Sequence, residues 1–216
     1  MKRIVTLSVL ILLVFAAGAQ TKSDPDAKKI LDAVSANFRT FKSPQASFTY
    51  KVENAQGKAL STKKGTVKMK GNKFRVSMDG LEIFSDGRTV WNYDKGAKEV
   101  TVNNVDANAS GMSPQKLFTN FYDKDFYYKL NGEKKQDGRT VQEIELTPID
   151  KTRPYHKVYV LVDKNSKSIY SAKFLEKSGG RYSYTVTSLK PSGAVADADF
   201  VFNKAKYPGV ELIDLR

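Results

Sequence analysis

Two side chains on which many catalytic and metal sites depend are scarce in this sequence. There is no cysteine, and His156 is the only histidine among 216 residues. Without cysteine the fold cannot be stabilised by disulfides, and thiolate nucleophiles and thiolate metal ligands are excluded. A transition-metal site is not expected from one imidazole without a spaced carboxylate cluster. We predict instead that His156 is a strand residue near the rim of a sheet.

Sequence motifs for catalysis are also missing. No serine lies in a G-x-S-x-G sequence, a Ser-His-Asp triad would have to use His156, and phosphate-loop motifs do not occur. A glycosidase with two carboxylates stays an open alternative, because any pair among the 23 acidic residues could meet in space. These acids sit mostly at polar positions of strands and turns, which favours a solvated face. We therefore expect neither an enzyme nor a bound cofactor.

Long apolar runs are absent except at the N-terminus. Lys2 and Arg3 precede an apolar stretch over residues 4–17, which ends in the small residues Ala17-Gly18-Ala19. This arrangement is typical of a secretory signal peptide. A membrane-spanning helix is the alternative, but the stretch is shorter than the roughly 20 residues that a bilayer needs. We predict a signal peptide over residues 1–19, cleaved near Ala19, and a single exported domain over residues 20–216.

Basic residues outnumber acidic ones. Without Lys2 and Arg3 the chain has 34 lysines and arginines against 23 acids, a formal charge of +11. Such a balance suits nucleic acid, anionic lipid headgroups or an acidic protein, but the lysines are scattered, which favours a solvated surface for most of them. The sequence FYDKDFYYKL over 121–130 could stack bases. An exported protein rarely meets that substrate, so no nucleic-acid partner is expected.

Helical periodicity occurs in two places. Asp24 suits an N-cap and Pro25 the first helical position, and an apolar stripe then recurs at helical spacing until Ser43-Pro44 ends the helix. The stripe consists of Ile30, Leu31, Val34, Phe38 and Phe41. Ser113-Pro114 predicts the start of a second helix, whose apolar side carries Leu117, Phe118 and Phe121.

After Pro44 the hydrophobic period changes to two, as in half-buried antiparallel strands. Phe48, Tyr50 and Val52 alternate with polar residues in 46–53, and Phe74, Val76 and Met78 do so in 73–79. Similar segments follow at 81–84, 89–93, 99–102, 126–130, 142–147, 157–162, 169–176 and 181–189. Short turn signals separate them, among them Asp86-Gly87, Asp137-Gly138 and Gly179-Gly180. The pattern predicts roughly ten strands in one large antiparallel sheet, which so few helices can cover on one face only.

Several segments resemble, in their order and spacing, the LolA family of periplasmic outer-membrane lipoprotein carriers. They are ILDAVSANF (30–38), ASFTYKV (46–52), KMKGNKFRVSM (68–78), SDGRTVWNY (85–93), LTP (146–148) and YPGVELIDLR (207–216). The resemblance implies a mainly β (α+β) fold, an incomplete antiparallel β-barrel of about 10–11 strands with an α-helical lid over an apolar cavity. It also implies a periplasmic monomer that holds lipoprotein acyl chains. An inner-membrane ABC-type release complex would supply them, and an outer-membrane acceptor, if present, would receive them.

The resemblance also implies candidate site residues. Those expected to line the lipid cavity or form the lid are Leu31, Val34, Phe38, Phe48, Tyr50, Lys70, Phe74, Val76, Met78, Leu117 and Phe118. Lys70 stands where the family has an arginine that bonds the lid backbone, and lysine lacks the planar five-donor fork of arginine. For the apolar residues the alternative is ordinary core packing. Trp91 is expected to pack within the core of the sheet, with direct lipid contact as the alternative.

The resemblance and the composition together leave three functions to compare. The favoured one is a non-enzymatic carrier of lipoproteins. The second is a related half-barrel that senses, stores or scaffolds a lipidic ligand without shuttling it. The third is a hydrolase of lipid esters.

Overall fold

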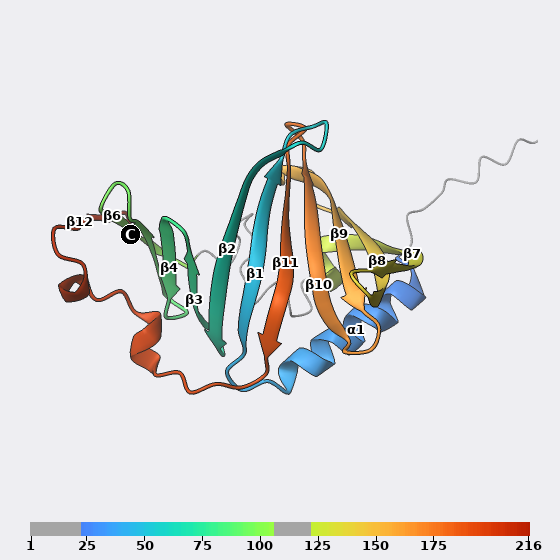
Figure 1. Ribbon diagram of the computed structural model, residues 1–216, viewed down its shortest axis with the longest axis horizontal. Coiled ribbons are helices and arrows are strands. Elements are labelled where there is room, and N and C mark those ends of the chain that lie inside the picture. Colours follow the sequence, from blue (N-terminus) through green and yellow to red (C-terminus); the bar gives the residue numbers. More distant parts are fainter. Residues whose placement is uncertain (1–22, 106–121) are drawn as a thin grey trace, which may run out of the picture.

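The computed structural model describes residues 23–105 and 122–216, and one large curved sheet dominates it (Figure 1). The strands are β1 (Gln45–Glu53), β2 (Ala59–Lys70), β3 (Lys73–Met78), β4 (Leu81–Ser85), β5 (Thr89–Asp94), β6 (Glu99–Asn104), β7 (Phe126–Gln136), β8 (Arg139–Pro148), β9 (Tyr155–Asp163), β10 (Ser168–Glu176), β11 (Arg181–Lys190) and β12 (Glu211–Asp214). Their order is β12-β6-β5-β4-β3-β2-β1-β11-β10-β9-β8-β7. Because β12 and β7 are the two edges, the sheet stays open.

The predicted incomplete barrel is therefore confirmed, with two differences in detail. The sheet has 12 strands rather than ten or eleven, and β12 pairs with β6 in parallel. Strand β2 lies outside the predicted strand segments, because its first residues show no alternation of apolar and polar side chains. It forms because β1 and β3 pair with it on both sides.

Helix α1 (Pro25–Arg39) begins as predicted. The Asp24 carboxylate accepts hydrogen bonds from the N–H groups of Asp26 (2.8 Å) and Ala27 (3.4 Å), and Pro25 occupies the first turn. The other described helices are single turns: α3 (Tyr122–Asp125), η1 (Asp197–Phe200) and η2 (Lys204–Lys206). Within residues 23–105 and 122–216, no helix is long and apolar enough to cross a membrane. The predicted signal peptide and the helix from Ser113 lie outside the described residues.

Two of the predicted turns show why their residues are needed. Asp137 and Gly138 alone connect β7 to β8, and both have positive φ (47° and 74°), as a two-residue hairpin turn requires. Between β4 and β5, Gly87 has a φ of 93°, and one Asp86 carboxylate oxygen accepts from the N–H groups of Arg88 and Thr89, each at 2.8 Å.

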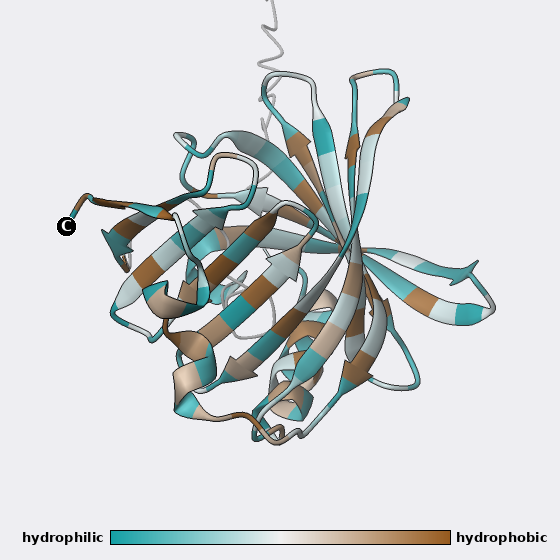
Figure 2. Cartoon of the chain, turned by 60° about the vertical axis from the view of Figure 1, so that its left-hand side comes forward, coloured by the Kyte–Doolittle hydropathy of each residue, from teal (hydrophilic) through white to brown (hydrophobic). Residues whose placement is uncertain are grey.

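The strands alternate apolar and polar residues, so the sheet has two distinct faces (Figure 2). We call the face against which α1 packs the inner face, and the opposite one the outer face. The main core lies between the inner face and α1. A second, smaller cluster lies on the outer face, where the chain after β11 crosses β3–β6 before it forms β12.

Aromatic rings fill this outer cluster. Phe202 lies 5.7 Å from Phe84 and 5.9 Å from Tyr93, measured between ring centroids, and Tyr207 stacks on Phe202 at 4.7 Å. Trp91 packs against the same cluster. The predicted packing role of Trp91 is thus confirmed, although on the outer face and not on the face that carries α1.

Candidate functional site

The inner face presents continuous rows of apolar side chains that run across the strands. Registry between neighbouring strands places the members of each row side by side. One row is Tyr50, Tyr184, Ala172, Val160, Ile144 and Leu130; the next is Val52, Tyr182, Phe174, Val158, Leu146 and Tyr128. Neither row contains a charged residue between β1 and β7, although Lys63 of β2 pairs with Tyr50 at the end of the first row. This part of the face therefore suits hydrocarbon.

The face divides into a covered half and a more open half. Helix α1 contacts β7 and β10, with Leu31 and Val34 buried at 2% and 4% exposure and Phe38 half-buried. Towards β1, β3 and β11 several large apolar side chains pack against the core but stay partly exposed: Tyr50, Phe74, Met78, Tyr182, Tyr184 and Val186. Apolar surface is thus accessible beside a closed core.

The apolar residues predicted for the cavity and lid that lie in the described chain come together in this one cluster. Phe48 and Val76 are buried in it, while Tyr50, Phe74 and Met78 pack against it half-buried. Their role towards lipid stays a prediction, since core packing would place them in the same way. Leu117 and Phe118 lie outside the described residues.

Sequence reasoning did not select the tyrosines of β11, although the alternation of Tyr182, Tyr184 and Val186 was visible. Tyr184 lies 5.0 Å from Tyr50, and Tyr182 stacks on Phe174 at 4.6 Å, measured between ring centroids. Burial raises the pKa of Tyr184 to about 12 and also raises the pKa of Tyr182. The phenols therefore stay neutral at physiological pH and add no charge to the face.

Helix α1 is fastened at its N-terminal end to the edge strand β7. The second oxygen of Asp24 accepts from the N–H of Leu130 at 3.0 Å, and the N–H of Asp24 donates to the carbonyl of Tyr128 at 2.9 Å. In its second turn, Asp32 accepts from the hydroxyl of Tyr122 at 2.7 Å. Asp24 thus caps the helix and joins it to the sheet at the same time.

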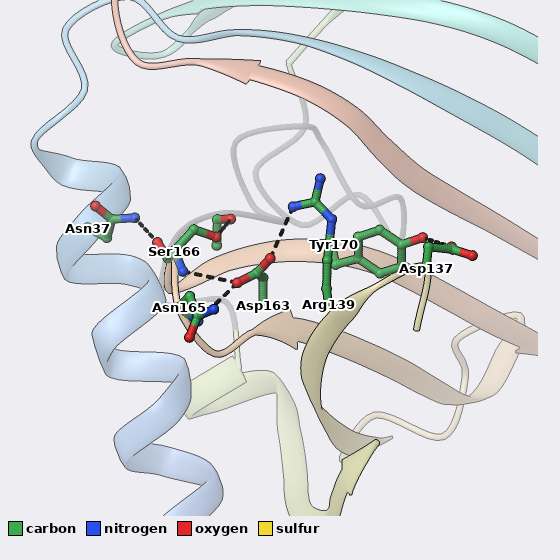
Figure 3. A network of polar contacts seen from close by, with 8 residues as sticks. Asn37, Asp137, Arg139, Asp163, Asn165, Ser166 and Tyr170 are labelled. Atoms are coloured by element: carbon green, nitrogen blue, oxygen red, sulfur yellow. Dashed lines mark hydrogen bonds and ion pairs between the residues drawn. The ribbon is translucent and has the colours of Figure 1, made fainter. Parts of the chain in front are cut away.

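At its C-terminal end the helix depends on Asn37, which sequence analysis did not single out. The side-chain amide of Asn37 donates to the carbonyl oxygens of Ser166 (3.0 Å) and Lys167 (3.2 Å) in the turn between β9 and β10 (Figure 3). A lone asparagine on a polar helix face carries no sequence signal, because its partner lies 129 residues away.

That turn is itself held rigidly by Asp163. Its carboxylate accepts from the N–H groups of Asn165 and Ser166 and from the Arg139 guanidinium, each at 3.0 Å (Figure 3). Burial would raise the pKa of Asp163, but the Ser166 N–H, Arg139 and the Asn165 N–H outweigh burial and hold the pKa below its usual value. The ionised carboxylate thus preorganises the carbonyl groups that bind Asn37.

Lys70 binds the chain segment that follows β11. Its ammonium binds the Asp197 carboxylate at 2.8 Å, and Lys73 binds the other oxygen of Asp197, also at 2.8 Å. Lys70 follows Met69, which is buried in the inner core, so strand alternation directs Lys70 to the outer face. Lys70, with Lys73, lowers the pKa of Asp197 to about 2. In the described structure Lys70 therefore fastens the C-terminal segment. Its bond to the second predicted lid helix stays a prediction, because that helix lies outside the described residues.

A cleft of about 430 Å³ opens beside α1, against β7, β8 and the end of β9. Its lining includes Ile30, Ala33, Leu130 and Val162 together with Lys29, Lys164 and Lys167. Leu130 and Val162 also belong to the inner-face cluster. The apolar inner face is thus reached from outside along the flank of the helix.

Groups suited to metal binding do not gather in the part of the chain that the structure describes. His156 is the second residue of β9 and is exposed, as predicted for a strand residue near the rim.

Comparison with known proteins identifies the family. The model of the family "Outer membrane lipoprotein carrier protein LolA" matches residues 39–203. An outer-membrane lipoprotein carrier protein of Serratia proteamaculans is 31% identical over 92% of this chain and 93% of its own length, and one of Pectobacterium carotovorum is 29% identical over the full length of both.

Solved structures share the fold. An uncharacterised conserved protein of Thermus thermophilus superposes with a TM-score of 0.59 at 13% identity, over 88% of this chain and 99% of that one. The Mycobacterium tuberculosis lipoprotein LppX superposes with a TM-score of 0.50 at 12% identity, over 81% and 100%. At such identities the likeness concerns the fold alone. Taken with the sequence relatives, whose match spans nearly the whole chain, these findings show that the protein belongs to the LolA family of outer membrane lipoprotein carriers.

Proposed function

We propose that the protein is a periplasmic carrier that binds the acyl chains of lipoproteins on the inner face of its sheet and delivers them to the outer membrane. The observation that supports this most directly is the two uncharged rows on the inner face, whose half-buried aromatic and aliphatic side chains adjoin a closed core. Membership of the lipoprotein carrier family supports lipoprotein acyl chains as the ligand of that surface.

The energy of acyl transfer explains why such a surface is needed. Removing one methylene from water is worth about 0.8 kcal/mol, so several lipid-length chains amount to tens of kcal/mol in total. A lipoprotein cannot cross an aqueous space against that cost without a substitute for the bilayer. The carrier must also bind less firmly than the receiving membrane, so that release remains favourable.

A lid provides a way to weaken binding. If acyl chains enter beneath α1, its apolar contacts through Leu31 and Val34 and the hydrogen bonds of Asn37 must be given up. The free energy of opening is subtracted from the affinity for lipid. The fastening of α1 would therefore set the free energy of opening.

The carrier role requires partners at both membranes. We propose an inner-membrane ABC-type release complex as donor and an outer-membrane component as acceptor, with the carrier acting as a monomer after its signal peptide has been removed near Ala19. No chemical step is required, because loading and release exchange one apolar environment for another. The proposal is thus of a chaperone and not of an enzyme.

The test is transfer of a lipoprotein from donor to acceptor vesicles. Phe74→Glu places a charge on the inner face and is expected to lower binding of a fluorescent fatty acid at least tenfold and to abolish transfer. The matched control is Thr66→Glu, on the outer side of the neighbouring strand β2, where the side chain is exposed. Equal loss in both variants, or none in Phe74→Glu, would contradict the assignment of the face.

The same assay separates the remaining functions. A protein that stores or senses a lipid would strip donor vesicles without loading acceptors. A hydrolase would release free fatty acid from lipid esters.

A further inference from the structure

The turns of two hairpins meet at one end of the sheet, where they project beyond the other strands (Figure 1). They are the β1–β2 turn and the β10–β11 turn, which are neighbours because β1 pairs with β11. We call residues 54–64 and 176–181 the hairpin tip. The Arg181 guanidinium donates to the carbonyl of Ala55 at 2.8 Å and so joins the two turns directly.

An ion-paired glutamate stabilises the base of the hairpin tip. Glu53 is buried and binds Lys51 at 2.8 Å and Lys173 at 2.6 Å. Lys173, with Lys51, lowers the pKa of Glu53 to about 2, so the carboxylate stays ionised and paired. The two hairpins therefore form one surface and not two independent loops.

Leu60 is the most exposed of the described large apolar residues of the chain, at 64%. Its exposure has a structural cause. Val52 pairs with Ser61 and Glu53 with Ala59, so the register shifts and Leu60 has no partner on β1. Such a bulge redirects the side chain of the extra residue.

The charge around Leu60 is strongly positive. Within the hairpin tip lie five cations, Lys58, Lys63, Lys64, Lys177 and Arg181, and one acid, Glu176. Lys63 and Arg181 donate to backbone carbonyls, of Asp79 and Ala55, which leaves their charges uncompensated. Lysines 58, 63, 64 and 177 are exposed.

We propose that the hairpin tip docks on the surface of an anionic lipid bilayer, with Leu60 entering the headgroup region and the cations lying over lipid phosphates. An apolar residue surrounded by cations is the chemistry of interfacial membrane binding. One leucine and a net charge of four give weak and reversible attachment, as a protein that must leave a membrane requires. This contact is separate from acyl binding on the inner face and needs no lipoprotein.

The absence of cysteine allows a direct test. Leu60→Cys, labelled with a polarity-sensitive fluorophore, is mixed with vesicles of phosphatidylcholine alone or with phosphatidylglycerol added. Leu215→Cys is the matched control, because Leu215 is equally exposed, at 62%, but lies after β12 at the far edge of the sheet. We expect a blue-shifted increase in fluorescence at position 60 only, with the anionic vesicles only, and its loss in high salt.

A second measurement uses unlabelled protein in vesicle flotation. Each neutralised cation is expected to lower partitioning about fivefold, so Lys58→Gln with Lys64→Gln should lower it about 25-fold, and Leu60→Glu should abolish it. Equal signals at positions 60 and 215, equal binding to neutral vesicles, or no binding by folded wild-type protein would overturn the proposal. Because these vesicles contain no lipoprotein, that failure would leave the carrier function standing.

Discussion

At the scale of single residues, Gly65 shows how closely the inner face is packed. It sits on β2 between Phe48 of β1 and Met78 of β3. A Cβ at this position would lie 2.5 Å from Cζ of Phe48 and 2.6 Å from Cγ of Met78. The glycine thus makes room for two larger side chains to meet across the strand between them.

Gly65→Ala is therefore expected to lower the free energy of unfolding by about 1–3 kcal/mol through overpacking. Denaturant unfolding measures this change. Replacing the neighbouring ring by a smaller side chain, in the double variant Gly65→Ala, Phe48→Leu, should relieve the overpacking. The double variant should then lose less free energy of unfolding than the sum of the two single variants. If the single variant is as stable as wild type, the two side chains have more freedom than the packing indicates.

At the scale of elements, α1 is the part of the described structure best placed to move. It lies across one end of the sheet, and its C-terminal end depends on the two hydrogen bonds of Asn37 (Figure 3). Each such bond contributes about 0.5–1.5 kcal/mol. Removing both should favour the open position of the helix without disturbing the core.

Asn37→Ala is expected to raise the affinity for a fluorescent fatty acid about fivefold or more, because less free energy is spent on opening. Stability should fall by about 1 kcal/mol at the same time. Ala36→Ser, at an exposed position of the same helix, should change neither quantity. Unchanged affinity in a destabilised Asn37→Ala protein would show that α1 does not control access.

At the scale of the whole molecule, the C-terminal segment ties the two sides of the outer face together. It begins at Asp197, held by Lys70 and Lys73 beside β2 and β3, and ends in β12 at the edge of the sheet. Between these points Phe202 inserts among the aromatic side chains of β4 and β5. The short strands β3–β6 thus gain a second layer on the face away from α1.

Phe202→Ala is expected to cost about 3–5 kcal/mol and to lower the melting temperature by about 10 °C. Trp91 should report the change by a red shift of its emission, since it packs against the same cluster. Val201→Ala, at a neighbouring position that is 41% exposed, should leave both signals near those of wild type. A red shift without loss of stability would mean that the segment covers the sheet but does not support it.

The period-two strands, the capped helix at Asp24 and the turns at Asp86-Gly87 and Asp137-Gly138 could all be predicted from the sequence, because they depend on neighbours within a few residues. The same local pattern identified the inner-face residues Phe48 and Phe74 and, with the order of motifs, the family. Tertiary structure decided the partners of Asn37 and Lys70, the placement of Trp91 on the outer face and the pairing of the polar β2. Each of these depends on contacts between segments far apart in the chain, and periodicity carries no information about which segments meet.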